Sequence, residues 1–130
     1  MTNDPPHSKK RILIVDDDPS IRHMLRRILI DEGYDTEAAA NGREGLNIAQ
    51  KNAVDLVLLD LKMPGMTGQE TLAQLAASHP GLPVIIISAF TRAESPLAFA
   101  SGRPWLQKPL DFPALLELIK RLAAQPAVGK

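Results

Sequence analysis

The sequence predicts an α/β fold, with one domain built on a doubly wound, five-stranded parallel sheet. Short apolar runs alternate with helical patterns five times along the chain, and residues 11–15 and 83–87 are almost wholly apolar. Strands without a polar face are typical of parallel sheets that helices cover on both sides. The 130 residues are enough for one such core and too few for two.

The first strand and helix have clear boundaries in the sequence. The apolar run 11–15 predicts a buried strand, and a run of three aspartates ends it. Asp18 followed by Pro19 has the pattern of a helix N-cap and a first helical residue. Apolar residues then recur at helical spacing as far as Gly33, which predicts the end of the helix.

The remaining elements repeat this alternation of strands and helices. Strands are expected at residues 36–40, 54–59, 83–87 and 105–107, and helices after Asn41-Gly42, at 70–78 and after Asp111. A loop is expected at 63–68, where proline and glycine interrupt the pattern.

The stretch between the last two strands is short for a helix and its connections. Ser95 and Pro96 have the pattern of a helix start and Gly102 that of a helix end, so we expect a short, mobile helix at 96–101. Pro104 lacks a backbone donor, which predicts that the strand after it lies at the edge of the sheet.

Composition narrows the class of protein further. Fifteen basic and 15 acidic residues give zero formal charge, which argues against nucleic-acid and membrane-surface binding. No cysteine is present, so thiol chemistry is excluded, and no apolar run is long enough to cross a membrane. We expect a cytoplasmic domain at 11–124, a disordered arm at 1–10 and a tail or linker stump at 125–130.

Polar side chains cluster at the carboxyl ends of the expected strands. They are Asp16, Asp17, Asp18, Asp60, Ser88 and Lys108. In a doubly wound sheet these ends converge and form the ligand site. Several carboxylates in one crevice require a counter-charge, which Mg²⁺ supplies well, and a hydroxyl with an ammonium suits a phosphoryl group. No glycine-rich nucleotide loop follows the first strand, so a carboxylate that forms an acyl phosphate is the natural alternative.

Four segments resemble the signature segments of response-regulator receiver domains. They lie at 12–19, 58–68, 87–89 and 106–109, and the second carries the specific pattern D-x-x-M-P-x-M-x-G. The resemblance runs from about residue 11 to residue 122 and implies the flavodoxin-like (βα)5 fold with strand order 2-1-3-4-5.

The resemblance also implies roles for individual residues. Asp60 corresponds to the phosphoacceptor, Asp17 to a direct Mg²⁺ ligand, and Asp16 to a second acidic ligand that often acts through water. The backbone carbonyl of Lys62 corresponds to the third protein ligand of the metal. Ser88 corresponds to the switch hydroxyl that moves onto the phosphoryl group.

Three further positions carry expectations from the same resemblance. Lys108 corresponds to the lysine that pairs with the acceptor, and the bond to Pro109 is expected to be cis. Trp105 occupies the place of a switch aromatic, and a packing role is the equal alternative for it. Lys62 and Phe90 stand where other receivers position the attacking water, and neither can accept its proton, so we expect slow hydrolysis of the phosphate.

The function that the resemblance implies is that of a signalling switch and not of an enzyme. A histidine kinase or a histidine phosphotransfer protein would donate the phosphoryl group, and an unidentified protein would respond to the altered surface. A basic face on the first helix is expected to be solvated or to lie beside the kinase-docking surface, and it comprises Arg22, His23, Arg26 and Arg27.

Alternatives remain at this point. A haloacid-dehalogenase-type phosphatase would need a second acid after the nucleophile, where this chain has Leu61 and Lys62. A pseudo-receiver that only binds a partner would not need the full set of acids, hydroxyl and lysine. The segment 106–109 also resembles receivers of hybrid histidine kinases, whereas Met1 with its own arm favours a stand-alone chain.

Overall fold

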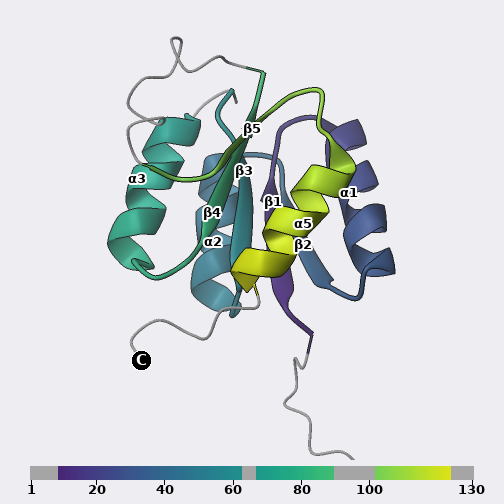
Figure 1. The fold of residues 1–130 in the computed structure, drawn as a ribbon. Helices are drawn as coiled ribbons and strands as arrows, with labels where there is room; N and C mark the ends of the chain where they lie inside the picture. The colour runs from purple at the N-terminus through teal and green to yellow at the C-terminus, as the bar shows by residue number, and fades with distance from the viewer. Residues whose placement is uncertain (1–8, 63–66, 90–101, 124–130) are drawn as a thin grey trace, which may run out of the picture.

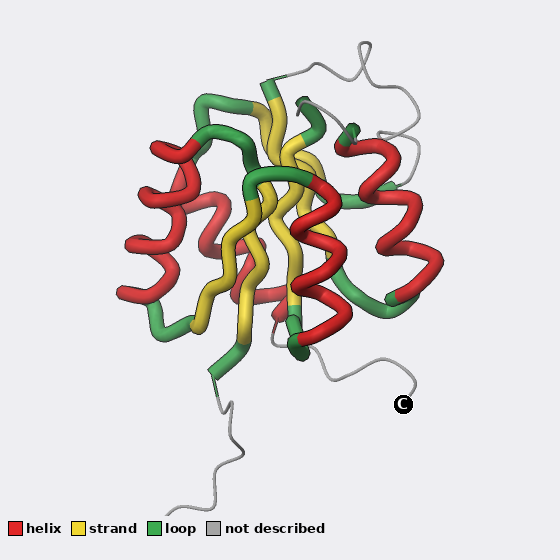
Figure 2. The backbone as a smooth tube through the Cα atoms, turned by 180° about the vertical axis from the view of Figure 1, so that it is seen from behind, coloured by secondary structure: helices red, strands yellow, loops and turns green. Residues whose placement is uncertain are grey.

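The computed structural model describes residues 9–62, 67–89 and 102–123. It confirms the predicted class, because five parallel strands form one sheet in the order β2-β1-β3-β4-β5. Helices cover both faces of this sheet (Figures 1 and 2). None of the helices in the described ranges is long and apolar enough to cross a membrane.

Strands and helices alternate as the sequence predicts, except between β4 and β5, where residues 90–101 lie outside the described part of the chain. Their bounds are β1 Arg11–Val15, α1 Pro19–Asp31, β2 Asp35–Ala39, α2 Gly42–Lys51, β3 Leu56–Asp60, α3 Gly68–Ser78, β4 Val84–Ser88, β5 Trp105–Gln107 and α5 Phe112–Ala123.

Several predicted boundaries were wrong by one or two residues. Strands β2 and β4 are shifted by one residue, and β3 begins two residues later and includes Asp60. Helix α3 begins at Gly68, because Thr67 and Glu70 form a reciprocal capping box that fixes its first turn. The predicted arm, tail and short helix at 96–101 fall mainly or wholly outside the described residues.

The core consists of two apolar layers, one on each face of the sheet. Alternate residues of β1 face opposite layers, so Leu13 and Val15 pack toward α2 and α3 while Ile12 and Ile14 pack toward α1 and α5. All four side chains are fully buried. This explains why the central strands read as continuous apolar runs, and it makes the sheet a rigid support for whatever lies at its ends.

Strand β5 lies at the edge of the sheet, as Pro104 predicts. The carbonyl of Pro104 accepts a hydrogen bond from the backbone N–H of Ile86 at 2.8 Å, which joins β5 to β4. A proline is tolerated at this position because Pro104 directly precedes β5 and contributes only its carbonyl to the bonding with β4.

Gly68 fits against the backbone that follows β3. Its N–H donates to the carbonyl of Leu61 at 3.1 Å. A Cβ at this position would lie 2.3 Å from the Cα of Leu61 and 2.6 Å from the carbonyl oxygen of Asp60. Since both atoms belong to the backbone, a side chain at residue 68 must displace the end of β3.

We therefore expect Gly68→Ala to destabilise the protein by roughly 1–3 kcal/mol, the usual cost of overpacking. Gly45→Ala is the matched comparison, because its Cβ would meet a side-chain methyl of Val15 at 2.8 Å. In Gly45→Ala, the higher helix propensity of alanine contributes about 1 kcal/mol and offsets part of the cost of this clash. Urea unfolding gives the free energy of unfolding of both variants, and we expect the lower value for Gly68→Ala. A Gly68→Ala variant that is at least as stable as Gly45→Ala would contradict this account.

Candidate functional site

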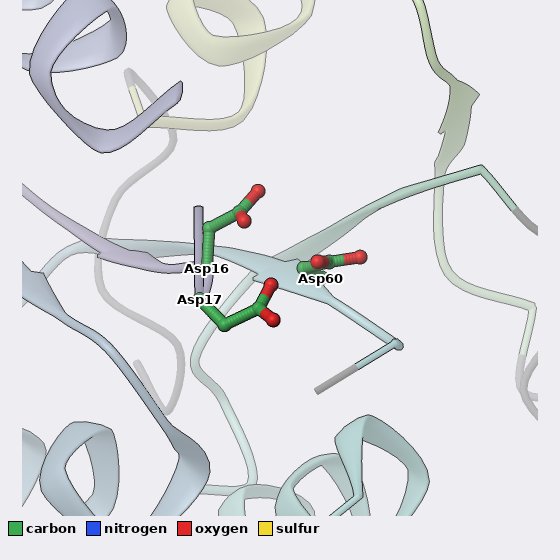
Figure 3. A group of neighbouring side chains, drawn as sticks. All are labelled: Asp16, Asp17 and Asp60. Carbon is green, nitrogen blue, oxygen red and sulfur yellow. The ribbon is translucent and has the colours of Figure 1, made fainter. Parts of the chain in front are cut away.

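Three carboxylates meet where β1 and β3 end. These strands are neighbours, and their register pairs Val15 with Leu59, so the residues that follow lie side by side. Ligand oxygens of Asp16, Asp17 and Asp60 all lie within 4.8 Å of one another (Figure 3). Asp16 and Asp60 are buried, whereas Asp17 is exposed at the mouth of the site.

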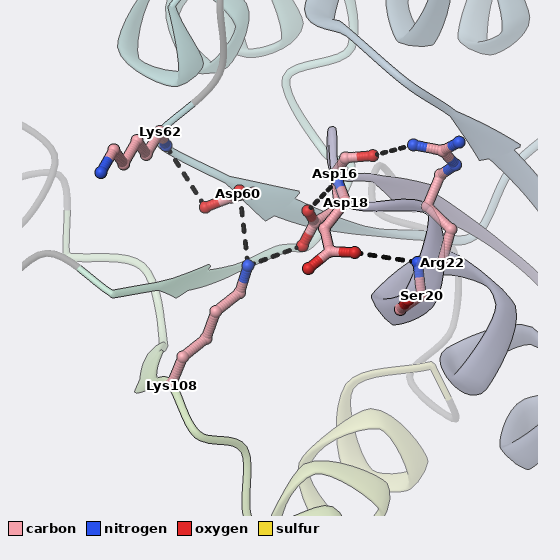
Figure 4. Close-up of polar contacts among 7 residues, drawn as sticks. All are labelled: Asp16, Asp18, Ser20, Arg22, Asp60, Lys62 and Lys108. Carbon is pink, nitrogen blue, oxygen red and sulfur yellow. Dashed lines mark hydrogen bonds and ion pairs between the residues drawn. The ribbon is translucent and has the colours of Figure 1, made fainter.

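The ammonium of Lys108 bridges two of these carboxylates. Its Nζ lies 2.9 Å from Oδ2 of Asp16 and 3.4 Å from Oδ2 of Asp60 (Figure 4). Lys108 directly follows β5, and its backbone N–H donates to the carbonyl of Ser88 at 2.8 Å. The bond between Lys108 and Pro109 is cis, as expected. Because β4 separates β5 from β3, the lysine side chain must extend past the end of β4 to reach the acids.

Backbone donors hold the other oxygen of each buried acid. The N–H of Asp18 donates to Oδ1 of Asp16 at 2.9 Å, and the N–H of Lys62 donates to Oδ1 of Asp60 at 3.2 Å. Each buried carboxylate is therefore bound to one backbone N–H and to Lys108. These contacts fix the carboxylate orientations without neutralising the total charge of the three acids.

The site favours a proton on Asp60. Burial and then the charge of Asp16 raise the pKa of Asp60 to about 6, while Lys108 and the N–H of Lys62 act in the opposite direction. Burial by itself lowers the pKa of Lys108, but its contacts with Asp16 and Asp60 outweigh this and raise it. The lysine therefore remains charged, yet it does not fully compensate the buried acids.

The structure places three of the remaining predicted residues, Ser88, Lys62 and Trp105. Ser88 ends β4, fully buried, one residue beyond the position that pairs with Asp60. The side chain of Lys62 is exposed and points away from Asp60, although its N–H contacts that carboxylate (Figure 4). Trp105 is half-buried and packs against the apolar layer of α2 and α3. Phe90 falls outside the described residues.

Two residues near the site have roles other than ligation. Asp18 is the N-cap of α1, as predicted, and its carboxylate accepts from the N–H of Ser20 at 2.8 Å. The reading of Arg22 as part of a solvated face was wrong, whereas the place of this face beside a docking surface stays a prediction. Arg22 is half-buried, and its Nη1 donates to the carbonyl of Asp16 at 2.7 Å. Charge patterning along the helix gave no signal for this inward contact.

The donor set fits a hard divalent cation. Carboxylate oxygens are the ligands that Mg²⁺ prefers, and the raised pKa of Asp60 marks a site with excess negative charge. A cation would relieve the repulsion between Asp16 and Asp60. Beside it, Lys108 supplies a second positive charge where phosphoryl oxygens could be bound.

Comparisons with known proteins agree with this geometry. The family model of the response regulator receiver domain matches residues 12–120 of this chain. The transcriptional regulatory protein GlrR of Escherichia coli K12 is 37% identical over 125 residues, which cover 93% of this chain and 28% of GlrR. The chain thus spans less than a third of the length of that relative.

Solved structures show the same fold. A CheY-like receiver domain protein from Methanospirillum hungatei superposes with a TM-score of 0.83 at 36% identity, covering 88% of this chain and 94% of that one. TrrA from Thermotoga maritima, in complex with Mg²⁺-BeF, gives 0.80 at 35% identity, covering 87% and 98%. TrrA has also been solved in complex with the histidine kinase ThkA.

The raised pKa of Asp60 predicts a pH dependence of stability without metal. The folded-state pKa exceeds the unfolded value, so the stabilisation is complete below about pH 4 and is lost as pH rises through about 6. Asp60→Asn mimics the protonated acid. It should therefore be more stable than wild type at about pH 7.5 in EDTA, by on the order of 1–3 kcal/mol.

Urea unfolding at about pH 4 and about pH 7.5 measures this difference. The control variant is Asp31→Asn, because Asp31 is an exposed acid at the end of α1. The free energy of unfolding of Asp31→Asn should depend on pH as that of wild type does. In Asp60→Asn, most of the decrease in this free energy between the two pH values should disappear. An Asp60→Asn variant that is less stable than wild type at the higher pH would contradict the charge balance described above.

Proposed function

The chain belongs to the response regulator receiver domain family, and from that membership we propose that it is a phosphorylation-controlled signalling switch with Asp60 as its phosphoacceptor. One observation supports this above all: the carboxylate of Asp60 lies at a strand end between two acids and the ammonium of Lys108. Receiver domains are signalling domains, and the chemistry proposed here is transfer of one group and not turnover of a substrate.

In the proposed reaction a carboxylate oxygen of Asp60 attacks the phosphorus of a phosphohistidine. A bond forms between that oxygen and phosphorus, the bond between phosphorus and the imidazole nitrogen breaks, and the histidine leaves with the electron pair. Catalysis of such a transfer consists mainly of positioning and charge stabilisation. The N–H of Lys62 and the ammonium of Lys108, which both contact Asp60, supply the positioning.

Asp16, Asp17 and Asp60, with the backbone carbonyl of Lys62, would hold Mg²⁺. The cation would neutralise charge on the acids and on the incoming phosphoryl group. Asp17 is the exposed acid of the three and therefore the one most available to a hydrated ion.

Ser88 and Lys108 would then bind the phosphoryl oxygens. Such contacts exist only in the phosphorylated protein, so they would shift the population between two conformations. Trp105, on the edge strand three residues before Lys108, would respond to that shift.

Histidine kinases or histidine phosphotransfer proteins are the proposed donors, since TrrA has been solved with a histidine kinase. We place the exchange in the cytoplasm, with an unidentified protein as the downstream target. A pseudo-receiver that only binds a partner is the competing proposal, and the grouping of three acids with Lys108 argues against it.

Acetyl phosphate with Mg²⁺ should add one phosphoryl group to the wild-type protein. Asp60→Asn should abolish the addition, because the variant keeps the size of the side chain and removes the nucleophile. Intact-mass spectrometry measures the product. Asp31→Asn, the exposed control, should be labelled as wild type is, and labelling of Asp60→Asn at the wild-type rate would refute the assignment.

Asp17→Ala should weaken Mg²⁺ binding on the order of tenfold or more, because a hard ligand is lost. Titration calorimetry measures the affinity directly and does not depend on phosphorylation. Asp18→Ala is the neighbouring control, since Asp18 caps α1 and its side chain is not among the three grouped acids. Equal Mg²⁺ affinity in Asp17→Ala and wild type would exclude the ligand role.

We expect the Asp60 phosphate to decay slowly, because the ammonium of Lys62 cannot accept a proton from water. Lys62→Gln introduces an acceptor and should speed decay, whereas Lys62→Met removes the charge without adding one and should not. Both changes leave the backbone carbonyl in place. Decay is followed by mass after the donor is removed, and identical lifetimes for the two variants would rule out this explanation.

A further inference from the structure

Arg22 connects helix α1 to the backbone of the acidic cluster. It is the fourth residue of α1, half-buried, and its Nη1 donates to the carbonyl oxygen of Asp16 at 2.7 Å (Figure 4). A hydrogen bond from a charged guanidinium is short and stronger than one between neutral groups. This bond therefore fixes the direction of the Asp16 carbonyl.

The direction of that carbonyl determines where Asp17 begins. A peptide unit is planar, so the carbonyl of Asp16 lies in one plane with the nitrogen and the Cα of Asp17. A contact that holds the Asp16 carbonyl consequently holds the point from which the Asp17 side chain extends.

Asp16 is held by several contacts, whereas the side chain of Asp17 has no such contact with the described part of the chain. The N–H of Asp16 donates to the carbonyl of Ala39 at 3.1 Å, and its two carboxylate oxygens are bound by Asp18 and Lys108. Within the described residues, the exposed Asp17 side chain makes no hydrogen bond or ion pair. Of the contacts at Asp16, the one made by Arg22 lies on the peptide shared with Asp17.

We propose that Arg22 is a positioning residue for the divalent-cation site, holding the peptide between Asp16 and Asp17 so that the Asp17 carboxylate faces Asp60. The inference rests on the proposed function, because it assigns Arg22 a part in the same Mg²⁺ site. Arg22 contacts the backbone of the site and not the cation.

Charge and positioning predict opposite effects for loss of Arg22. The guanidinium is a cation near the metal site, so its removal would strengthen Mg²⁺ binding if only Coulomb repulsion mattered. If it holds the peptide, its removal frees Asp17 and weakens binding. The sign of the change in affinity therefore separates the two explanations.

Titration calorimetry with MgCl2 on the full chain tests the sign. Arg22→Ala should raise the dissociation constant on the order of tenfold, as loss of a residue that orients a metal ligand does. Arg22→Lys keeps the charge and one donor and should recover part of the affinity. Arg26→Ala is the matched control, because Arg26 lies on the same helix and contacts Thr36 instead, at 3.2 Å.

A second measurement needs no metal. In EDTA, amide hydrogen exchange of Asp18, whose N–H is bonded to Asp16 Oδ1, reports local opening of the turn between β1 and α1. It should be faster in Arg22→Ala than in Arg26→Ala and wild type, at equal global stability by urea unfolding. If Arg22→Ala proves unstable, the same comparison is made with Arg22→Lys.

The outcomes distinguish the two proposals. If wild type does not bind Mg²⁺, the proposed function fails, and the exchange of Asp18 still decides whether Arg22 holds the turn. If wild type binds Mg²⁺ and Arg22→Ala binds it equally or more tightly, the positioning role is overturned. Weaker binding with unchanged Asp18 exchange overturns it as well.

Discussion

The charge balance among two buried aspartates, one exposed aspartate and one lysine is the constraint on which the site depends. Asp16 and Asp60 are removed from water and stand against each other, and burial together with the charge of Asp16 raises the pKa of Asp60 to about 6. Lys108 bridges them but leaves an excess of negative charge. A site in this condition gains from binding a divalent cation. In the proposed function, the Asp60 carboxylate held there reacts with a phosphoryl group whose oxygens approach Lys108.

The fold maintains this unfavourable arrangement through its core. Residues 12–15 of β1 and all of β3 are buried between two layers of helices, so the chain cannot easily separate the acids at the ends of these strands. Local donors then fix each carboxylate, and Gly68 lets the backbone after β3 pack closely. The buried core thus keeps the acids together at the carboxyl ends of β1 and β3 despite their repulsion, and functional sites commonly contain ionisable groups perturbed in this way.

The alternation of apolar runs and helical patterns was sufficient to predict the sheet, its helices and the strand ends that carry Asp16, Asp17, Asp60 and Lys108. The helix N-cap at Asp18 could also be predicted from the sequence, because a cap depends only on residues that are close in the chain. The contact of Lys108 with Asp16 joins residues 92 apart in the chain. The convergence of the strand ends placed both residues in one crevice, but the family resemblance paired Lys108 with the acceptor Asp60 and gave no sign of the contact with Asp16. Arg22 was misread, since a periodic pattern cannot show that one charged side chain of a helix turns inward toward a carbonyl.

Carboxyl-carbon NMR of the aspartates during a pH titration and a Mg²⁺ titration tests the central claim most directly. Without metal, Asp60 should titrate near pH 6, and neutralising Asp16 with Asp16→Asn should lower that value. At neutral pH, Mg²⁺ should shift the carboxyl signals of Asp16, Asp17 and Asp60 along one binding curve and leave that of Asp31 unchanged. If Asp60 titrates with the ordinary pKa of an aspartate and Mg²⁺ shifts none of the three carboxyl signals, the account of a shared site with excess negative charge is wrong.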